Sequence, residues 1–279
     1  MNQGFANVFF FGMFSQGFMW NALISGTMVA LLASGVGFFA ILRDASFAAH
    51  ALPKIGFAGA AGAVLLNVSP ILGLVVFAVG GALGIGWLGK RDRHEVGTAL
   101  LLVAALGVGA LFLVLNDKYA AGAYALLFGQ LVGVSASETV YIVVLSFVAL
   151  LVLLILFRPM LYVTILPDIA QARGLPTAGL SIFYLVIVGI ATAVTVPVVG
   201  ALLSFSMMIA PAATARALWR SPAAVAIGAM VEAVLIVWLS LSFAYTTGWP
   251  VGFFVATLAA LFYAVAKGYE AVWINRRIS

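Results

Sequence analysis

The chain has 279 residues, of which 65% are hydrophobic and only 8% are charged. An average soluble domain carries about 25% charged residues, so 13 basic and 8 acidic side chains are too few to cover a soluble fold of this length. The composition therefore indicates a polytopic membrane protein and excludes soluble enzymes, nucleic-acid-binding modules and disordered chains. The absence of cysteine also excludes disulfides, thiolate metal sites and cysteine nucleophiles.

About 20 apolar residues span a bilayer as a helix, and continuous apolar stretches of this kind recur along the whole sequence. They predict an all-α polytopic membrane protein, a single transmembrane domain over residues 1–279 with about nine helices. The expected spans are 17–42, 46–66, 70–89, 96–115, 139–157, 178–196, 198–218, 222–245 and 250–267. A β-barrel is not expected, because no stretch alternates between apolar and polar residues.

Two segments and one short link do not form simple spans. Residues 1–16 are aromatic and are expected to lie along the outer membrane interface; they contain no Lys or Arg, so a cleavable signal peptide is not expected. Residues 119–135 are apolar but contain Gly122, Gly129 and Gly133, which favours a short outer helix or a re-entrant segment. Pro197 is the expected outer link between the sixth and seventh spans.

The basic residues orient the expected spans. With the N-terminus outside, the inner connections carry 11 of the 13 basic residues. The positive-inside rule therefore favours an N-out, C-in topology. The basic residues at the inner connections are Arg43, Lys90, Arg91, Arg93, Arg158, Arg173, Arg216, Arg220, Lys267, Arg276 and Arg277.

Glycines recur at helical spacing in the second and third spans. Gly56, Gly59 and Gly62 lie in the second span, and Gly80 and Gly84 form a G-x-x-x-G pair in the third. Small residues let helix backbones approach closely in a bilayer, so these positions are expected at helix–helix contacts.

Residues 84–90 match the pattern G-x-x-x-x-G-K of a phosphate-binding loop. Such a loop also needs Ser or Thr after the lysine and a strand before the first glycine. Here Arg91 follows, and the residues end a membrane helix. The chain is therefore not expected to be an enzyme with its own ATPase site.

An inner segment after the fifth span has the pattern of a short helix. Pro167 suits the first helical position, and the carboxylate of Asp168 in the first turn suits the helix dipole. Gly174 can end the helix in the left-handed conformation, and Pro176 prevents continuation. A helix of about two turns is expected across the cytoplasmic face, although an ordinary loop helix has the same pattern.

Two ionisable residues are expected within spans, where such groups are costly and are functional candidates. His50 lies about one turn inside the second span and Glu232 lies in the middle of the eighth. An interhelical hydrogen bond would also explain His50, and a polar neighbour would explain Glu232. Lys54 follows His50 by one helical turn and could snorkel or pair with Glu232.

Ordered motifs over most of the chain resemble the membrane permease subunit of the ATP-binding-cassette importers for zinc, manganese and iron. Residues 199–203 with 210–216 resemble that family's "V-G-x-L-L … P-A-A-T-A-R" span. Residues 46–53 resemble its "S-H-A-x-L-P-G" segment, and 168–176 its inner "D-P-E-x-A-x-x-x-G-L-P" segment. Residues 18–23 and 245–252 resemble the openings of its first and last spans.

The resemblance implies a helical bundle like that of type II importers, in the bacterial cytoplasmic (inner) membrane. Its implied partners are a cytoplasmic ATP-binding subunit, an extracytoplasmic metal-binding protein, a second permease copy and the lipid bilayer, but no nucleic acid. Residues 167–175 would be the coupling helix, and Arg216 and Arg220 would lie on the cytoplasmic face near the ATPase. The implied coupling residues are Pro167, Asp168, Ile169, Ala170, Gln171, Arg173 and Gly174.

Two positions depart from the family pattern. Ser46 stands where many members have an aspartate that pairs with the histidine four residues later, and Lys54 replaces a glycine. His50, Ser46 and Glu232 are the expected metal-pathway residues, with Ser46 holding a water in place of the carboxylate. An imidazole without carboxylates favours zinc, followed by manganese and iron. The metal is cargo, and no resident cofactor is expected.

Three other functions remain open from the sequence. A permease for a metal chelate, such as a siderophore or cobalamin, would not need His50. An ion-coupled secondary transporter would show intramembrane carboxylates and inverted repeats, whereas one mid-span acid, Glu232, is visible. A membrane scaffold would leave the short inner helix unexplained.

Overall fold

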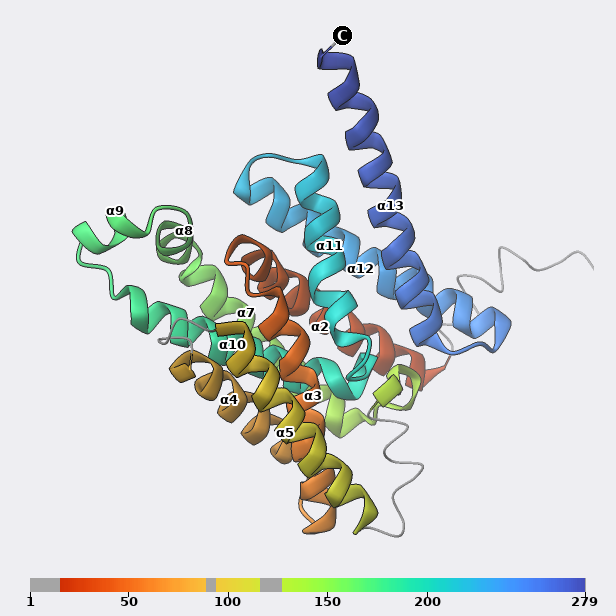
Figure 1. Cartoon of the computed structure of the whole chain (residues 1–279). Coiled ribbons are helices and arrows are strands. Elements are labelled where there is room, and N and C mark those ends of the chain that lie inside the picture. Colours follow the sequence, from red (N-terminus) through yellow and green to blue (C-terminus); the bar gives the residue numbers. More distant parts are fainter. Residues whose placement is uncertain (1–15, 89–93, 116–126, 279) are drawn as a thin grey trace, which may run out of the picture.

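The structure, a computed structural model, describes residues 16–88, 94–115 and 127–278. The described residues form α-helices joined by short turns, with one 3₁₀ turn and no strand (Figure 1). The elements are α2 (Gly17–Leu42), α3 (Ser46–Leu65), α4 (Pro70–Leu88), α5 (His94–Val114), η3 (Leu131–Gly133), α7 (Ala136–Ile155), α8 (Phe157–Ile165), α9 (Pro167–Ala172), α10 (Thr177–Val199), α11 (Ser204–Leu218), α12 (Pro222–Thr247) and α13 (Val251–Ile278).

Eight of these helices are long and apolar enough to cross a membrane, which confirms the polytopic all-α fold. The exception among the expected spans is α11, which has 15 residues. At 1.5 Å per residue it is about 22 Å long, shorter than the roughly 30 Å hydrocarbon core. The count of nine spans therefore stays a prediction.

Local sequence signals explain where several helices begin and end. Ser135 and Glu138 form a capping box at the start of α7, in which the Ser135 hydroxyl accepts from the Glu138 N–H at 3.3 Å. The Ser221 hydroxyl accepts from the Ala224 N–H at 3.3 Å at the start of α12. Gly248 ends α12 in the left-handed region, with φ +73°. Such caps satisfy backbone groups that the helices leave unpaired.

The helix α2 is the centre of the bundle. It packs against α7, α10, α11 and α12, and these helices surround it in Figure 1. A side chain at Gly37 would overlap the carbonyl group of Met208 in α11, so glycine is required for this close approach of two backbones. The centre of the molecule is thus filled by backbone and mainly apolar side chains, with a few buried hydroxyl groups such as those of Ser25 and Ser34.

Close packing by glycine is confirmed in the second span and in part in the third. Gly59 of α3 faces Gly73 of α4, and a Cβ on either would overlap the carbonyl oxygen of the other. The expectation for the third span was wrong at Gly80, where a Cβ would have nothing within 4 Å. Gly80 lies on the exposed face of α4, whereas a Cβ at Gly84 would lie 3.3 Å from the Leu101 side chain of α5, so only Gly84 of this pair is at a helix–helix contact.

The turn between α10 and α11 differs from the expected one. Pro197 lies within α10, and the chain leaves the helix at Gly200, whose φ is +96°. The fixed φ of proline, about −65°, is itself helical. A positive φ is needed to turn the chain and is readily adopted by glycine.

Residues 127–133 lie beside this turn. The Gln130 N–H donates to the Pro197 carbonyl at 3.2 Å, and the Leu202 N–H donates to the Leu127 carbonyl at 3.1 Å. This described part contains one 3₁₀ turn, η3, rather than a membrane-length helix. Residues 116–126, and residues 1–15 of the expected outer segment, lie outside the described residues.

Candidate functional site

The His50 side chain lies in the first half of α3 and contacts two residues. Its ring meets Phe205 of α11 edge to face, with the ring centroids 4.9 Å apart. Its Nε2 atom is hydrogen-bonded to the Lys54 Nζ atom. An ammonium group can only donate, so with Lys54 protonated the imidazole nitrogen is the acceptor in this contact.

The contact between His50 and Lys54 answers a question that the sequence left open. Snorkelling and a pair with Glu232 were the two alternatives for Lys54, and neither included His50. The four-residue spacing of His50 and Lys54 could have predicted this contact, because residues four apart share one face of a helix.

Glu232 lies on α12, away from His50. Its carboxyl group is beside Thr214 of α11, and its Oε1 atom is buried without a hydrogen-bond partner among the described residues. The helix α12 packs against α2, α11 and α13, whereas α3 packs mainly against α4, α5 and α10. Among the described residues, no hydrogen bond or ion pair joins Glu232 to His50 or Lys54.

Ser46 is the first residue of α3 and is half-buried. It precedes His50 by one turn and follows a tight turn at Asp44, whose φ is +51°. In the described part of the chain, no three His, Asp or Glu side chains gather closely enough to hold a metal ion. One chain therefore offers His50 as a single nitrogen ligand.

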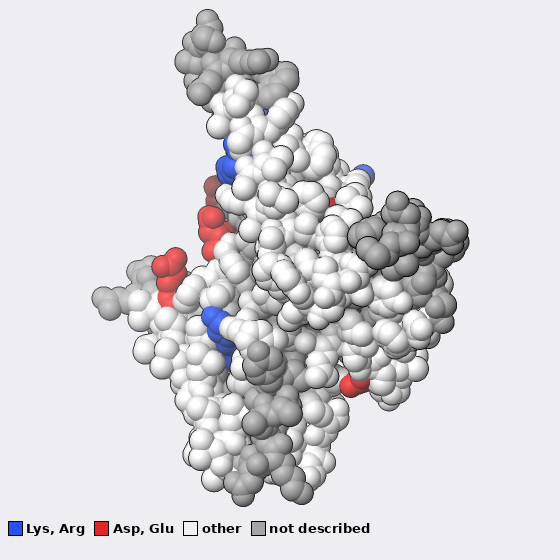
Figure 2. Space-filling model, turned by 90° about the vertical axis from the view of Figure 1, so that its right-hand side faces the viewer, with Lys and Arg blue, Asp and Glu red and all other residues white. Residues whose placement is uncertain are grey.

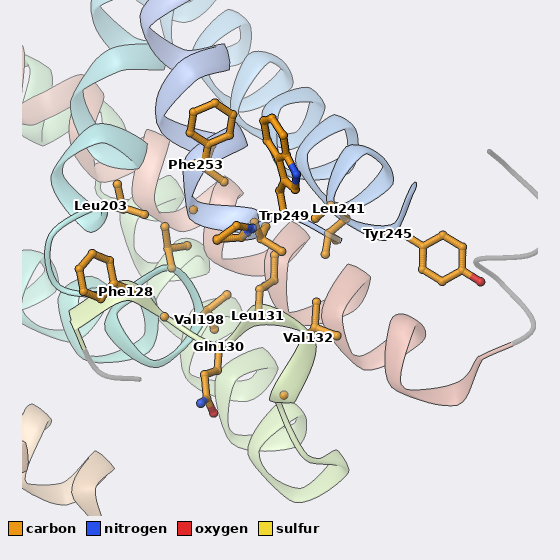
Figure 3. A pocket seen from close by; sticks show the side chains of 18 of the residues that line it. Phe128, Gln130, Leu131, Val132, Val198, Leu203, Leu241, Tyr245, Trp249 and Phe253 are labelled. Carbon is orange, nitrogen blue, oxygen red and sulfur yellow. The ribbon is translucent and has the colours of Figure 1, made fainter. Parts of the chain in front are cut away.

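Two cavities lie near the turn at Gly200, and neither is lined by His50, Ser46 or Glu232. The larger, about 1060 Å³, lies between residues 128–133, the start of α2, the end of α12 and the start of α13 (Figure 3). Its lining is mainly apolar and includes Trp249 and Phe253. The smaller, about 680 Å³, lies between the starts of α4 and α7. Glu138 in its lining is already engaged in the capping box of α7.

The expected inner helix is α9, and its two ends are formed as the sequence suggests. Pro167 occupies the first turn. At the other end the Leu175 N–H donates to the Ala170 carbonyl at 3.0 Å and the Gly174 N–H to the Gln171 carbonyl at 2.9 Å. This pair of bonds is a Schellman motif, and Gly174 has the required positive φ, +73°. The helix ends at Ala172, so the remainder of 167–175 is its termination.

The outer surface of α9 and the adjoining part of α8 is apolar and exposed. Ile169 has 45% of its surface exposed, whereas Ala170 is fully buried. The Arg173 guanidinium carbon lies 5.3 Å from the centre of the Tyr162 ring. Exposed apolar groups with charged neighbours are typical of protein-binding surfaces. We call this the α9 surface; it consists of Tyr162, Ile165, Leu166, Asp168, Ile169, Gln171 and Arg173.

Arg43 joins the α8–α9 unit to the bundle. It is the residue after α2; its Nη1 donates to the Thr164 hydroxyl of α8 at 3.2 Å, and its Nη2 is hydrogen-bonded to the Ser181 hydroxyl of α10. Its guanidinium also lies over the ring of Tyr184. In the sequence Arg43 is only a sign of topology, because nothing there shows which helices meet at a span end.

Arg216 and Arg220 lie at the same end of the bundle as α9. The helix α10 runs from α9 to the Gly200 turn, and α11 returns to Leu218 (Figure 1). Arg216 is in the last turn of α11, and both arginines are exposed. The placement of this end of the bundle in the cytoplasm stays a prediction.

Much of the outer surface is uncharged, as a lipid-facing surface requires. Figure 2 shows a face on which Lys, Arg, Asp and Glu are sparse. Of the membrane-length helices, α5 and α13 are among the least buried, with 11% and 17% of their apolar windows inside the structure. Their exposed apolar faces are available to lipid or to another protein chain.

Residues 15–269 match the family model described as the ABC 3 transport family. The chain belongs to the ABC 3 transport family. Over 278 residues, covering 96% of this chain and 95% of the relative, it is 26% identical to the manganese transport system membrane protein MntC of Halalkalibacterium halodurans. The match confirms the resemblance found in the sequence and makes the chain a multi-pass bacterial membrane protein.

Other similar proteins have different metals in their names. The chain is 27% identical to the high-affinity zinc uptake system membrane protein ZnuB of Haemophilus influenzae, over 72% of this chain and 78% of that protein. Its fold resembles a chain of the solved structure of PsaBC from Streptococcus pneumoniae in complex with Fab, with a TM-score of 0.84 and 23% identity over 92% of this chain and 94% of that chain. The two chains therefore share their fold.

Proposed function

We propose that this chain is the membrane subunit through which an ABC importer moves a divalent metal ion into the cytoplasm, with zinc as the main cargo. The family match over residues 15–269 is the observation that carries the proposal. It is supported by relatives whose names refer to zinc and manganese transport and by a probable iron transport system membrane protein of H. influenzae, 27% identical over 92% of this chain.

The ligand chemistry of α3 favours zinc. His50 offers an imidazole nitrogen, and position 46 offers a hydroxyl rather than a carboxylate. Imidazole suits zinc, whereas carboxylate oxygens suit manganese, calcium and magnesium. A single nitrogen from each chain is far from the four ligands of a structural zinc site. Weak binding is useful in a pathway, because a tightly held ion would not leave.

The α9 surface is the proposed contact with a cytoplasmic ATPase subunit. It is exposed, mainly apolar and attached to the bundle through Arg43. Closure of the ATPase would move α9 as a rigid body, and a helix with a fixed end transmits such motion better than an extended loop. The opposite end, at Gly200 and residues 127–133, would face an extracytoplasmic metal-binding protein. A second permease copy would complete the pathway.

The alternative functions have less support. A chelate permease would need a wide route, and neither of the two cavities reaches His50. A secondary transporter would need several mid-membrane carboxylates, and Glu232 is the single one in the middle of a described span.

The test is metal uptake by the complete importer, with its ATPase and binding protein, in cells that lack other zinc importers. We expect zinc uptake that exceeds manganese and iron uptake. His50→Ala should abolish it, whereas His94→Ala, at the other histidine of the chain, should not. Glu232→Gln should lower the rate without abolishing uptake, because no hydrogen bond joins Glu232 to His50 among the described residues. Uptake of an intact chelate but not of free ions, or unchanged uptake by His50→Ala in an assembled complex, would refute the proposal.

A further inference from the structure

Lys54 and His50 form an unusual pair for a membrane helix. Both are half-buried in α3, and the Lys54 ammonium group is hydrogen-bonded to His50 Nε2. An imidazolium ring carries a hydrogen on both nitrogens and could not accept this bond, so a charged Lys54 makes it only to a neutral imidazole. Its one free lone pair, the pair that a metal ion would bind, is therefore directed at Lys54.

The surroundings keep this pair together. Phe205 of α11 packs edge to face against the His50 ring, which restricts the ring to its present orientation. Lys54 is not part of the ion pair found among the described residues, which joins Lys267 and Glu270 in the second half of α13. Within the described part of the chain, no carboxylate is ion-paired with Lys54, and its contact is with the imidazole.

We propose that Lys54 is a specificity-determining residue, whose ammonium group occupies the His50 nitrogen until a metal ion displaces it. This inference rests on the proposed function, in which His50 meets the metal in transit. The ammonium acts as a tethered competitor, since it uses the same lone pair and repels a divalent cation nearby. The pathway thus releases the metal readily.

A tethered competitor would also discriminate between metals. An ion that gains strongly from an imidazole nitrogen, such as zinc, can replace the ammonium contact. Manganese prefers oxygen ligands and would gain less from the same exchange. Because the cost of displacing the ammonium group is common to both ions, Lys54 would lower both affinities alike, but at concentrations that saturate the site with zinc it would reduce the occupancy by manganese more than that by zinc.

The experiment compares Lys54→Met with wild type in the complete importer. Methionine has a similar length but no charge and no donor. We expect the apparent KM for zinc uptake to fall by about tenfold or more once the repelling charge is removed, while the maximal rate falls because release is slower. At metal concentrations that saturate the wild type with zinc but not with manganese, the ratio of manganese to zinc uptake should rise. Lys54→Arg, which keeps a cation, should stay near wild type, and Lys267→Met serves as the matched control.

A second measurement is retention of radioactive zinc by the purified complex without ATP. Lys54→Met should retain zinc that wild type loses on washing. The complex is purified without the metal-binding protein, and this chain itself adds little background because it has no cysteine and two histidines. If methionine prevents assembly, Lys54→Gln, which is also uncharged, allows the same comparison.

A third measurement uses the unmodified complex with ¹⁵N-labelled histidine. Added zinc should change the His50 Nε2 resonance, which is identified by its loss in His50→Ala.

The results separate this inference from the proposed function. Unchanged KM, rate and retention in the uncharged variants, together with loss of uptake in His50→Ala, would overturn the role of Lys54 and leave the proposed function intact. Unchanged uptake in His50→Ala would overturn both. An Nε2 resonance in the wild-type complex that does not respond to zinc would also count against displacement.

Discussion

The guanidinium carbon of Arg43 lies 5.1 Å from the centre of the Tyr184 ring, and the Tyr184 hydroxyl donates to the Val36 carbonyl at 3.0 Å. The Tyr184 hydroxyl group is therefore hydrogen-bonded to α2, and the face of its ring packs against the Arg43 guanidinium. Through Thr164, Arg43 also reaches α8, which is directly connected to α9. This contact gives the α9 surface a fixed position relative to the central helix.

Removal of the Arg43 side chain is expected to loosen α8 and α9 from the bundle. Arg43→Met loses two hydrogen bonds and a cation–π contact, together worth about 1–3 kcal/mol. We expect a lower melting temperature in detergent and less metal transported per ATP hydrolysed. Arg43→Lys, which keeps the charge but not the planar fork, should be intermediate. A transport-to-ATP ratio equal to that of wild type would contradict the proposed role of Arg43.

The end of α9 depends on the backbone conformation of Gly174. Gly174→Val should destabilise the Schellman motif by about 1–2 kcal/mol, because a left-handed conformation is costly for side chains with a Cβ. A Cβ at this position meets nothing within 4 Å, so the effect should come from the backbone alone. ATP hydrolysis should continue while transport falls. Gly174→Asn, which tolerates positive φ, should retain most of the transport; equal loss in both variants would point to a side-chain effect instead.

The orientation in the membrane can be tested by cysteine labelling, since the chain has no cysteine of its own. We expect Arg220→Cys to be inaccessible to an impermeant reagent from outside the cell, because the positive-inside rule places Arg220 in the cytoplasm. Thr247→Cys, at the opposite end of α12, should be labelled from outside. The reverse pattern would invert the topology.

The turn at Gly200 should tolerate substitution poorly. A Cβ at Gly200 would overlap backbone atoms of Leu127 and Phe128, and φ is +96°. Gly200→Ala is therefore expected to cost more than about 3 kcal/mol, the sum of strain and forced separation of two segments. Gly248→Ala is the matched control, because φ there is +73° but no atom lies within 4 Å; it should cost about 1 kcal/mol. Similar thermal shifts for the two variants would show that the contact with residues 127 and 128 is unimportant.

Local and compositional features of this protein followed from the sequence alone. The apolar runs predicted the long helices, because a bilayer imposes both the length and the composition of each span. The start of α12 at Pro222 and the positive φ of Gly174 follow from the chemistry of a few neighbouring residues. The motifs at 199–203 and 210–216 indicated the family.

The contacts between helices were decided only by the tertiary structure. Every span is apolar on all sides, so periodicity could not show which face of α4 meets α3, and Gly80 was wrongly placed at a contact. The position of the turn at Gly200 instead of Pro197 depends on the approach of residues 127–130 to the end of α10. Glu232 and His50 lie on helices that α11 joins, and the sequence contains no information about that distance. Arg43 acquires its three partners only when α8 and α10 fold against α2, because each hydrogen bond spans more than 100 residues of chain.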